Sequence, residues 1–304
     1  MRLLKLIQLY FYVCEVYDNQ IEHHVQRHTK NKIEPRFTDK EVITCYLFAV
    51  CYEKRQRIKD IHDCIDTHYK DWFPQLPTYE TFNRRLNRLN PAFPALLSGL
   101  VSKWQQKALD SQEFKFLLTD SMPIITCAGN REGKVARAIT EKGYNSTKKM
   151  YFYGVKLHAL SIGEKGTLPA LEYLILSGAS EHDLNVQREI LRNTSNQYVF
   201  ADKAFKDSDL DELYQKNEGD LLIPVKYRKG QLKEYKQRHK AADDLYSRAV
   251  SSIRQPIECF FGWMIDKTDI QRASKVRSTK GLLVHIFGKI TAAIFGRLDE
   301  LKLI

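Results

Sequence analysis

The pattern of apolar and polar residues predicts helices for the first third of the chain. Thr38 to Glu41 has the form of a capping box, and the apolar run Val42 to Val50 follows it directly. Ile58, Ile61 and Ile65 then recur at helical spacing. We therefore expect residues 1 to about 105 to be helical.

One predicted helix, residues 78–89, has one apolar and one basic side. Phe82 and Leu86 belong to its apolar stripe. The polar residues of the other side, which we expect to face outward, are Asn83, Arg84, Arg85, Asn87 and Arg88. Such a side is typical of a helix that lies on an anionic surface.

After a polar bridge near residue 110, the pattern changes to strands. Residues 114–119, 151–160 and 171–177 are apolar or aromatic runs with short connections, which predicts three consecutive antiparallel strands. A helix at 183–193, a strand at 198–201, a helix at 207–216 and a strand at 221–225 follow, and the remainder reads as helical. We predict an all-α domain over residues 1–108 and a mixed α/β domain with a five-stranded sheet over residues 109–304.

The charge distribution adds a class of partner. The 304 residues include 48 Lys and Arg against 37 Asp and Glu, which gives a net charge of +11. Counted by segment, the net charge is +4 over residues 1–110, −2 over 111–220 and +9 over 221–304. Basic segments around an acidic one indicate a polyanion-binding surface around a carboxylate-bearing centre, and nucleic acid is the obvious polyanion. The alternative is that the charges lie on solvated helix faces.

Composition excludes several other classes. The six cysteines are too few for a disulfide scaffold, and none has the CxxC spacing of a zinc site. Glu15 and Asp18 stand where a secretory signal would need small residues. Charged residues interrupt the apolar segment 281–298, so we expect a buried helix there. The expected protein is cytoplasmic, associated with the nucleoid, and has no membrane partner.

Two of the predicted strands end in an aspartate. Asp120 follows Leu117 to Thr119, and Asp202 follows Val199 to Ala201. A carboxylate at the rim of an apolar sheet must be compensated by hydrogen bonds or cations. If the two strands are neighbours, the pair could bind magnesium, which prefers oxygen ligands. The alternative is that each aspartate only caps the helix that follows.

A third candidate carboxylate, Glu258, lies in an apolar and aromatic stretch. Arg254 precedes it by four residues, so the two side chains share a face if the segment is one helix. The alternative is a surface ion pair. Pro256 leaves open whether a helix begins there, is kinked, or runs through the segment.

These residues belong to motifs that resemble a known family, and the resemblance covers nearly the whole chain. The motifs are, in order, FTDKEVI at 37–43, LPTYETFNRRL at 76–86, TDSMP at 119–123, YGVKLH at 153–158, ADKAF at 201–205 and the stretch around Glu258. In this order they resemble the DDE transposases of bacterial insertion sequences, most closely insertion sequence family nine-eighty-two. The catalytic domain of these enzymes is RNase H-like, which implies that fold for residues 109–304.

The resemblance also implies roles for individual residues. Asp120, Asp202 and Glu258 would be the catalytic residues and the ligands of two Mg²⁺ ions, with Mn²⁺ able to substitute. Asp120 would bridge the two ions, and each of the other two would complete one site. Arg254 matches the arginine of a Tyr, Arg, Glu, Lys signature. The sequence departs from that signature at Ser251, in place of Tyr, and at residue 265, an isoleucine in place of Lys with a lysine two residues later.

The implied reaction is phosphodiester chemistry on double-stranded DNA. Water would first cut at the terminal inverted repeats of the transposon, and the 3′-hydroxyl set free would then attack target DNA. A homodimer on DNA is implied, because two DNA ends must be brought together. Two alternatives are an RNase H-like nuclease without strand transfer and a non-catalytic DNA-binding protein derived from a transposase.

The basic residues outside the triad are predicted DNA contacts. Arg84, Arg85 and Arg88 would bind phosphates from the helix at 78–89. The loop after the first strand would contribute Arg131, Arg137, Lys148 and Lys149, unless it is a disordered flap. Lys203 would touch the scissile phosphate or only balance local charge. A basic insertion around 226–250 contains Lys226, Arg228 and Lys229 and has Tyr227 and Tyr235 between its charges, which favours DNA over a solvated helix. Arg254 completes the set.

Overall fold

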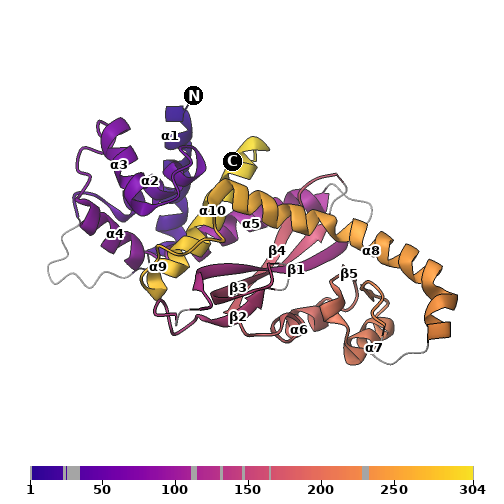
Figure 1. Ribbon diagram of the computed structural model, residues 1–304. Coiled ribbons are helices and arrows are strands. Elements are labelled where there is room, and N and C mark those ends of the chain that lie inside the picture. The colour runs from indigo at the N-terminus through magenta and orange to yellow at the C-terminus, as the bar shows by residue number, and fades with distance from the viewer. Residues whose placement is uncertain are drawn as a thin grey trace. The chain divides into compact units, whose positions relative to one another are not determined.

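A computed structural model describes most of the chain, and the chain forms two compact units within it (Figure 1). The described residues are 2–22, 25, 35–110, 115–130, 133–145, 148–163, 166–227 and 233–303. The helical unit consists of Met1–Lys103, Ile125–Thr140 and Met264–Ile304, and the sheet unit consists of Trp104–Ile124 and Glu141–Trp263. This division differs from a single boundary at residue 108, because the C-terminal segment packs with the N-terminal helices.

The helical unit combines helices from both ends of the chain. The N-terminal part supplies α1 (Arg2–Val16), η1 (Tyr17–Ile21), α2 (Asp39–Cys51), α3 (Ile58–His68), α4 (Tyr79–Arg88) and the first part of α5 (Ala92–Asp110). The C-terminal part supplies α9 (Thr279–Leu283), η3 (Val284–Gly288) and α10 (Lys289–Glu300), which follow one another as one helix, Thr279–Glu300. The helical character predicted for the N-terminal region is confirmed.

The centre of the helical unit is α2. The predicted capping box is present, with the Thr38 hydroxyl accepting from the backbone N–H of Glu41 at 3.2 Å. All residues from Val42 to Val50 are buried. The C-terminal helix lies directly against α2, since a Cβ added at Gly288 would be 2.6 Å from the Tyr46 ring. The missing side chain at this glycine permits the close contact between the two helices.

Within the described residues, one helix is long and apolar enough to cross a membrane by length and composition, namely Thr279–Glu300. The structure buries 67% of its apolar window inside the protein. The predicted buried helix is therefore the observed arrangement, and its apolar side belongs to the core of the helical unit.

The sheet unit alternates strands and helices in the predicted order, with one additional strand. Its strands are β1 (Phe116–Ala128), which extends into the helical unit, β2 (Glu141–Asn145), β3 (Met150–Gly163), β4 (Ala170–Gly178), β5 (Tyr198–Phe200) and β6 (Asp220–Leu222). Its helices are α6 (Asp183–Asn193), η2 (Lys203–Phe205), α7 (Ser208–Lys216) and most of α8 (Lys233–Thr268).

The strands form one mixed sheet. Their order is β2-β3-β1-β5-β6, and β4 also pairs with β3. The pairs β2·β3 and β3·β4 are antiparallel, whereas β1·β5 and β5·β6 are parallel. Figure 1 shows α8 running along the sheet and α6 and α7 near β5. This mixed sheet with flanking helices, preceded in the chain by helices, confirms the expected RNase H-like α/β fold.

Two details of the sheet differ from the prediction. The strand predicted to end before Asp120 continues to Ala128, because Met122, Ile124 and Thr126 keep the alternation of buried side chains beyond the aspartate. The additional strand is β2. Its residues are mostly polar, so the apolar pattern of the sequence contained no signal for it. It pairs with the first half of β3.

The helix that carries Glu258 runs through Pro256. It begins at Lys233 and continues for 36 residues. The proline lacks the N–H that would bond to the carbonyl four residues earlier, at Ser252. Ser252 is exposed, so water can satisfy that carbonyl. The structure thus excludes a helix start at Pro256, since α8 runs from Lys233 to Thr268.

Candidate active site

Two carboxylates are brought together by neighbouring parallel strands. In the pairing of β1 with β5, Leu117 lies opposite Val199 and Leu118 lies opposite Phe200. Continued by two residues, the same register would place Asp202 opposite Asp120, and the charge of Asp202 is near enough to raise the pKa of Asp120. Side chains two residues apart on a strand share a face, so both aspartates extend on the face of Leu118 and Phe200. Asp202 lies two residues after the end of β5, in an extended conformation before η2.

The third carboxylate reaches this place from α8 together with its arginine. Arg254 Nη1 lies 3.2 Å from Asp120 Oδ2, and Arg254 Nη2 donates to Glu258 Oε1 one turn along the helix. The guanidinium thus binds a carboxylate of the sheet and a carboxylate of the helix at once. Arg254 is mostly buried, with 13% of its side chain exposed, whereas Glu258 is 55% exposed. The pair is therefore more than a surface pair, because it ties α8 to β1.

The electrostatics of the site show an excess of negative charge. Burial raises the pKa of Asp120 to about 6, and the charges of Glu258 and Asp202 act in the same direction. Arg254 and the backbone N–H of Ser121, which donates to Asp120 Oδ1 at 2.8 Å, oppose the rise. One guanidinium does not compensate three carboxylates, so a further cation would be stabilised here.

The donor set fits a hard divalent cation. All three side chains offer carboxylate oxygens, which Mg²⁺ and Mn²⁺ prefer. Among the residues that the structure describes, no three His, Cys, Asp or Glu side chains are already clustered closely enough to hold a metal ion. Arg254 accounts for this spacing at Asp120 and Glu258, since both carboxylates are turned toward its guanidinium.

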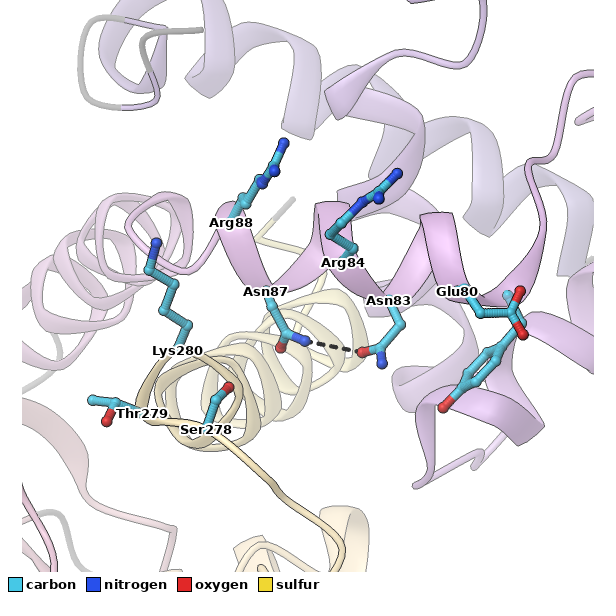
Figure 2. Close-up of a pocket in the computed structure, with 9 residues that line it drawn as sticks. Glu80, Asn83, Arg84, Asn87, Arg88, Ser278, Thr279 and Lys280 are labelled. Atoms are coloured by element: carbon cyan, nitrogen blue, oxygen red, sulfur yellow. Dashed lines mark hydrogen bonds between the residues drawn. The ribbon is translucent and has the colours of Figure 1, made fainter. Parts of the chain in front are cut away.

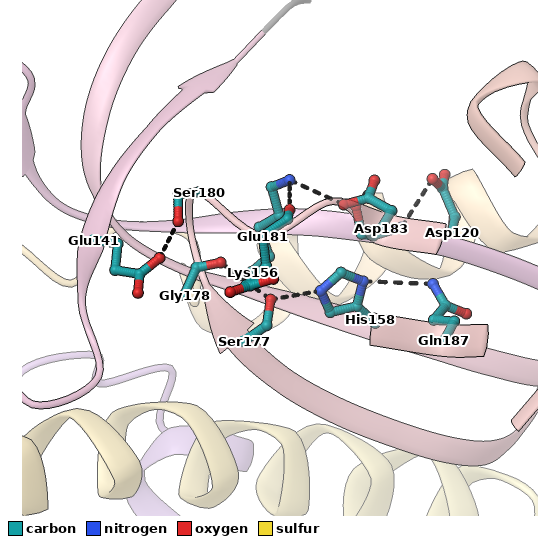
Figure 3. A network of polar contacts seen from close by, with 11 residues as sticks. Asp120, Glu141, Lys156, His158, Ser177, Gly178, Ser180, Glu181, Asp183 and Gln187 are labelled. Atoms are coloured by element: carbon teal, nitrogen blue, oxygen red, sulfur yellow. Dashed lines mark hydrogen bonds and ion pairs between the residues drawn. The ribbon is translucent and has the colours of Figure 1, made fainter. Parts of the chain in front are cut away.

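The opposite face of β1 is held by α6. Ser121 Oγ donates to Asp183 Oδ2 at 2.9 Å. Lys156 Nζ donates to Asp183 Oδ1 at 2.9 Å (Figure 3). Lys156 also donates to the carbonyl of Glu181 at 2.7 Å. The sequence predicted a helix that begins at Asp183, and this is confirmed. It did not predict the contact of Asp183 with Ser121, because that contact depends on how α6 packs against β1.

A buried polar chain continues from the same face of β1. Thr119 donates to Gln187 Oε1. Gln187 Nε2 lies 3.4 Å from His158 Nδ1 (Figure 3). His158 Nε2 lies 2.8 Å from the hydroxyl of Ser177. Burial lowers the pKa of His158 to about 4, so the ring is neutral at pH 7, with Nδ1 as acceptor and Nε2 as donor. This series of hydrogen bonds links β1, β3, β4 and α6 on the face of β1 opposite to Asp120.

Most of the predicted DNA-contacting residues lie on the surface of their own unit. Those exposed in the sheet unit are Lys148, Lys149, Lys203 and Lys226, and those exposed in the helical unit are Arg84, Arg88 and Arg137. Arg131, Arg228 and Lys229 lie outside the described residues.

Arg85 does not face outward as predicted. Its Nη2 donates to Asp39 Oδ1 at 2.8 Å, and only 13% and 6% of the two side chains are exposed. The helix face that contains Arg84 and Arg88 remains exposed. The guanidinium of Arg85 thus binds Asp39 inside the helical unit, and the prediction that Arg85 contacts DNA is wrong.

Comparison with known proteins identifies the family. The sequence model of the transposase DDE domain matches residues 108–295, more than half of the chain. Neither the curated proteins nor the solved structures contain a significant match. Members of the matched family are phosphoryl-transfer enzymes that bind DNA and generally use divalent metal ions. The fold, the three acidic residues and this match agree, and the chain belongs to the transposase DDE domain family.

Proposed function

We propose that this transposase hydrolyses DNA at the ends of a mobile element and joins the freed 3′-hydroxyl to target DNA. The observation that carries the proposal is the arrangement of three carboxylates on neighbouring elements. Asp120 of β1 and Glu258 of α8 both contact Arg254, and Asp202, two residues after β5, is near enough for its charge to raise the pKa of Asp120. The resemblance of the sequence motifs to insertion sequence family nine-eighty-two supports the same assignment.

In this proposal the three carboxylates hold two Mg²⁺ ions, or Mn²⁺ in their place. When bound, such ions supply Lewis-acid activation of the attacking oxygen and stabilise the leaving oxygen of an in-line displacement at phosphorus. Asp120 is the most enclosed of the three, while Asp202 and Glu258 are exposed and thus accessible to DNA.

Arg254 has two roles in the proposal. In the protein without DNA, its guanidinium neutralises Asp120 and Glu258 and keeps their side chains oriented toward each other. When a phosphodiester enters, the same guanidinium is placed to donate to a phosphate oxygen, for which its planar donor geometry is suited. Lys203, exposed directly after Asp202, offers a second cation to the DNA strand.

The reaction occurs in two displacements. In the first, water attacks a phosphorus at the element end, the bond to the 3′ oxygen breaks, and that oxygen leaves as a hydroxyl. In the second, this hydroxyl attacks a phosphorus of target DNA and displaces another 3′ oxygen. The partners are therefore double-stranded terminal inverted repeats and target DNA, and a homodimer would hold two ends together at the nucleoid.

A strand-transfer assay tests the proposal. The full chain is incubated with duplexes that carry candidate terminal repeats, a target plasmid and Mg²⁺ or Mn²⁺. Joined products should be lost in Asp120→Asn, Asp202→Asn and Glu258→Gln, and retained in Asp209→Asn, which changes an exposed aspartate of α7. Products that persist in the triad variants would refute the site assignment.

The same assay separates the proposal from its alternatives. Cleaved ends without joined products, at saturating target DNA, would favour an RNase H-like nuclease. Binding without cleavage in the parent protein would favour a non-catalytic DNA-binding protein. Light scattering of the DNA complex tests the dimer, which a strictly monomeric complex would exclude.

A further inference from the structure

The helical unit contains a groove that is lined mainly by polar and charged residues from two distant parts of the sequence. The groove has a volume of about 680 Å³ and lies between α4 and the start of α9 (Figure 2). From α4 it is lined by Asn83, Arg84, Asn87 and Arg88. From the C-terminal part it is lined by residues 278–280.

The two walls of the groove are in close contact. A Cβ added at Gly281 would lie 3.2 Å from Asn87 Oδ1, so the glycine lets the start of α9 approach α4. Asn87 Nδ2 donates to Asn83 Oδ1 at 3.0 Å, which orients both amides along the groove (Figure 2). The positions of the lining side chains are therefore set by the packing of the helical unit itself.

The charge of the groove is mainly positive. Arg84, Arg88 and Lys280 are exposed, and Figure 2 shows both arginines rising from α4 while Lys280 extends from α9. Within the described part of the chain, none of these three side chains forms an ion pair or a hydrogen bond, in contrast to the side chain of Arg85 on the same helix. Glu80 is the acidic residue of the lining and lies toward the opposite end of α4.

The start of the C-terminal helix adds to the positive electrostatic potential of the groove. Ser278 caps it, with its hydroxyl accepting from the N–H of Gly281 at 3.1 Å. The N–H groups of Thr279 and Lys280 have no acceptor within the helix, because they belong to its first turn. The positive end of the helix dipole thus lies beside three unpaired cations from two elements, a combination that attracts phosphate oxygens.

We propose that this groove binds the phosphate backbone of duplex DNA, and that the segment from Ser278 to Lys280 is part of the DNA interface together with α4. The inference rests on the proposed function, which makes DNA the partner, and it adds a C-terminal wall that the sequence pattern does not predict. The DNA-binding surface of the helical unit is therefore composite, formed by residues separated by nearly 200 positions.

Binding of the full chain to a labelled 30-base-pair duplex of mixed sequence, measured by fluorescence anisotropy between 50 and 200 mM NaCl, tests the groove. Removal of one side chain that binds a phosphate should make the negative slope of log K against log salt less steep by about 0.9. This corresponds to a roughly eightfold weaker affinity at 0.1 M salt. We expect this for Lys280→Ala as well as for Arg84→Ala. Lys59→Ala, which removes an exposed lysine of α3 outside the groove, is the matched control.

Protection of the lysine gives a direct reading of contact. Acylation of surface amines followed by mass spectrometry should show that the duplex shields Lys280 but not Lys59. Equal reactivity of Lys280 with and without DNA, together with an unchanged salt slope for Lys280→Ala, would overturn the proposal. Because the Lys280 side chain is exposed, thermal unfolding should be the same in this variant and the parent, which excludes misfolding as the cause of weak binding.

The two proposals fail in different ways. If the groove assignment is wrong and the proposed function is right, Lys280→Ala binds and joins DNA like the parent while Asp120→Asn does not join it. If the proposed function is wrong, Asp120→Asn changes no reaction, and the groove variants still bind DNA more weakly than the parent.

Discussion

The contrast between Arg84 and Arg85, adjacent residues of α4, leads to a prediction that separates folding from DNA binding. Arg85 donates to Asp39 at 2.8 Å, and both side chains are almost completely buried. Its guanidinium also lies 5.8 Å from the centre of the Phe37 ring. Arg84 is exposed and belongs to the DNA groove. We expect Arg85→Ala to destabilise the protein and Arg84→Ala to weaken DNA binding.

The size of the effect follows from the carboxylate that is left behind. Loss of one partner of a buried ion pair costs roughly 3–5 kcal/mol, because the other charge stays desolvated. Asp39 lies in the first turn of α2, where the helix dipole favours a negative charge, and the Tyr17 hydroxyl donates to it at 3.4 Å. These residual interactions place the expected destabilisation near the lower limit, about 3 kcal/mol. For a protein of this size that is a decrease of roughly 6–12 °C in Tm.

The assay is urea denaturation followed by circular dichroism, in parallel with DNA anisotropy. Arg84→Ala should unfold within about 0.5 kcal/mol of the parent, since its side chain is exposed and unpaired in the described structure. A double-mutant cycle of Arg85→Ala with Asp39→Asn should return part of the stability. If Arg85→Ala were no less stable than Arg84→Ala, the inference of a buried structural pair would be wrong.

Three further predictions concern the packing at a glycine, a buried lysine and the contacts of Asp183. Gly288→Ala should destabilise the protein by about 1–3 kcal/mol in thermal unfolding, because the new Cβ would meet Tyr46 at 2.6 Å. Gly262→Ala is the control: its new Cβ has no atom within 4 Å, so the change should be neutral or stabilising by up to about 1 kcal/mol. Burial lowers the pKa of Lys289 from 10.5 to about 8, so the folded state holds fewer protons than the unfolded state between these values and stability should rise with pH there. Lys289→Met should accordingly stabilise by about 3 kcal/mol at pH 7 in urea titrations, with the gain disappearing above about pH 10.5; a gain independent of pH would contradict this. Asp183→Asn should lower the DNA cleavage rate roughly 10- to 100-fold with unchanged DNA affinity, because it weakens the contacts that hold Ser121 beside Asp120, the proposed metal ligand. An unchanged rate would show that the contacts are not needed.

The sequence predicted the elements that depend on local pattern. The capping box at Thr38, the helix that begins at Asp183 and the apolar strands before Asp120 and Asp202 are all present. Each of these signals lies within a few residues, so no tertiary contact is needed to recognise it. The convergence of the triad was inferred from the family resemblance rather than from spacing, since Glu258 is far from both aspartates in the sequence.

Features that depend on packing between distant segments could not be predicted from the pattern. The C-terminal helix packs against α2 through Gly288, and one glycine in an apolar run does not identify its partner. The position of Arg85 is a similar case, since α4 has three arginines within five residues. Helical spacing puts all three arginines outside the apolar stripe of α4. Only the position of Asp39 decides that Arg85 is the one that turns inward.

The partners of the basic residues also limit what net charge can say about DNA binding. The excess of +11 counts Arg85, Lys156 and Arg254 equally with Arg84 and Lys280. The first three neutralise Asp39, Asp183 and the pair Asp120 and Glu258, and so contribute mainly to structure before DNA arrives. Arg84 and Lys280 have no such partner among the described residues, and their field extends into solvent. Attraction of DNA by the helical unit therefore depends on a small number of unpaired cations, and removing one of them should affect binding more than the net charge suggests.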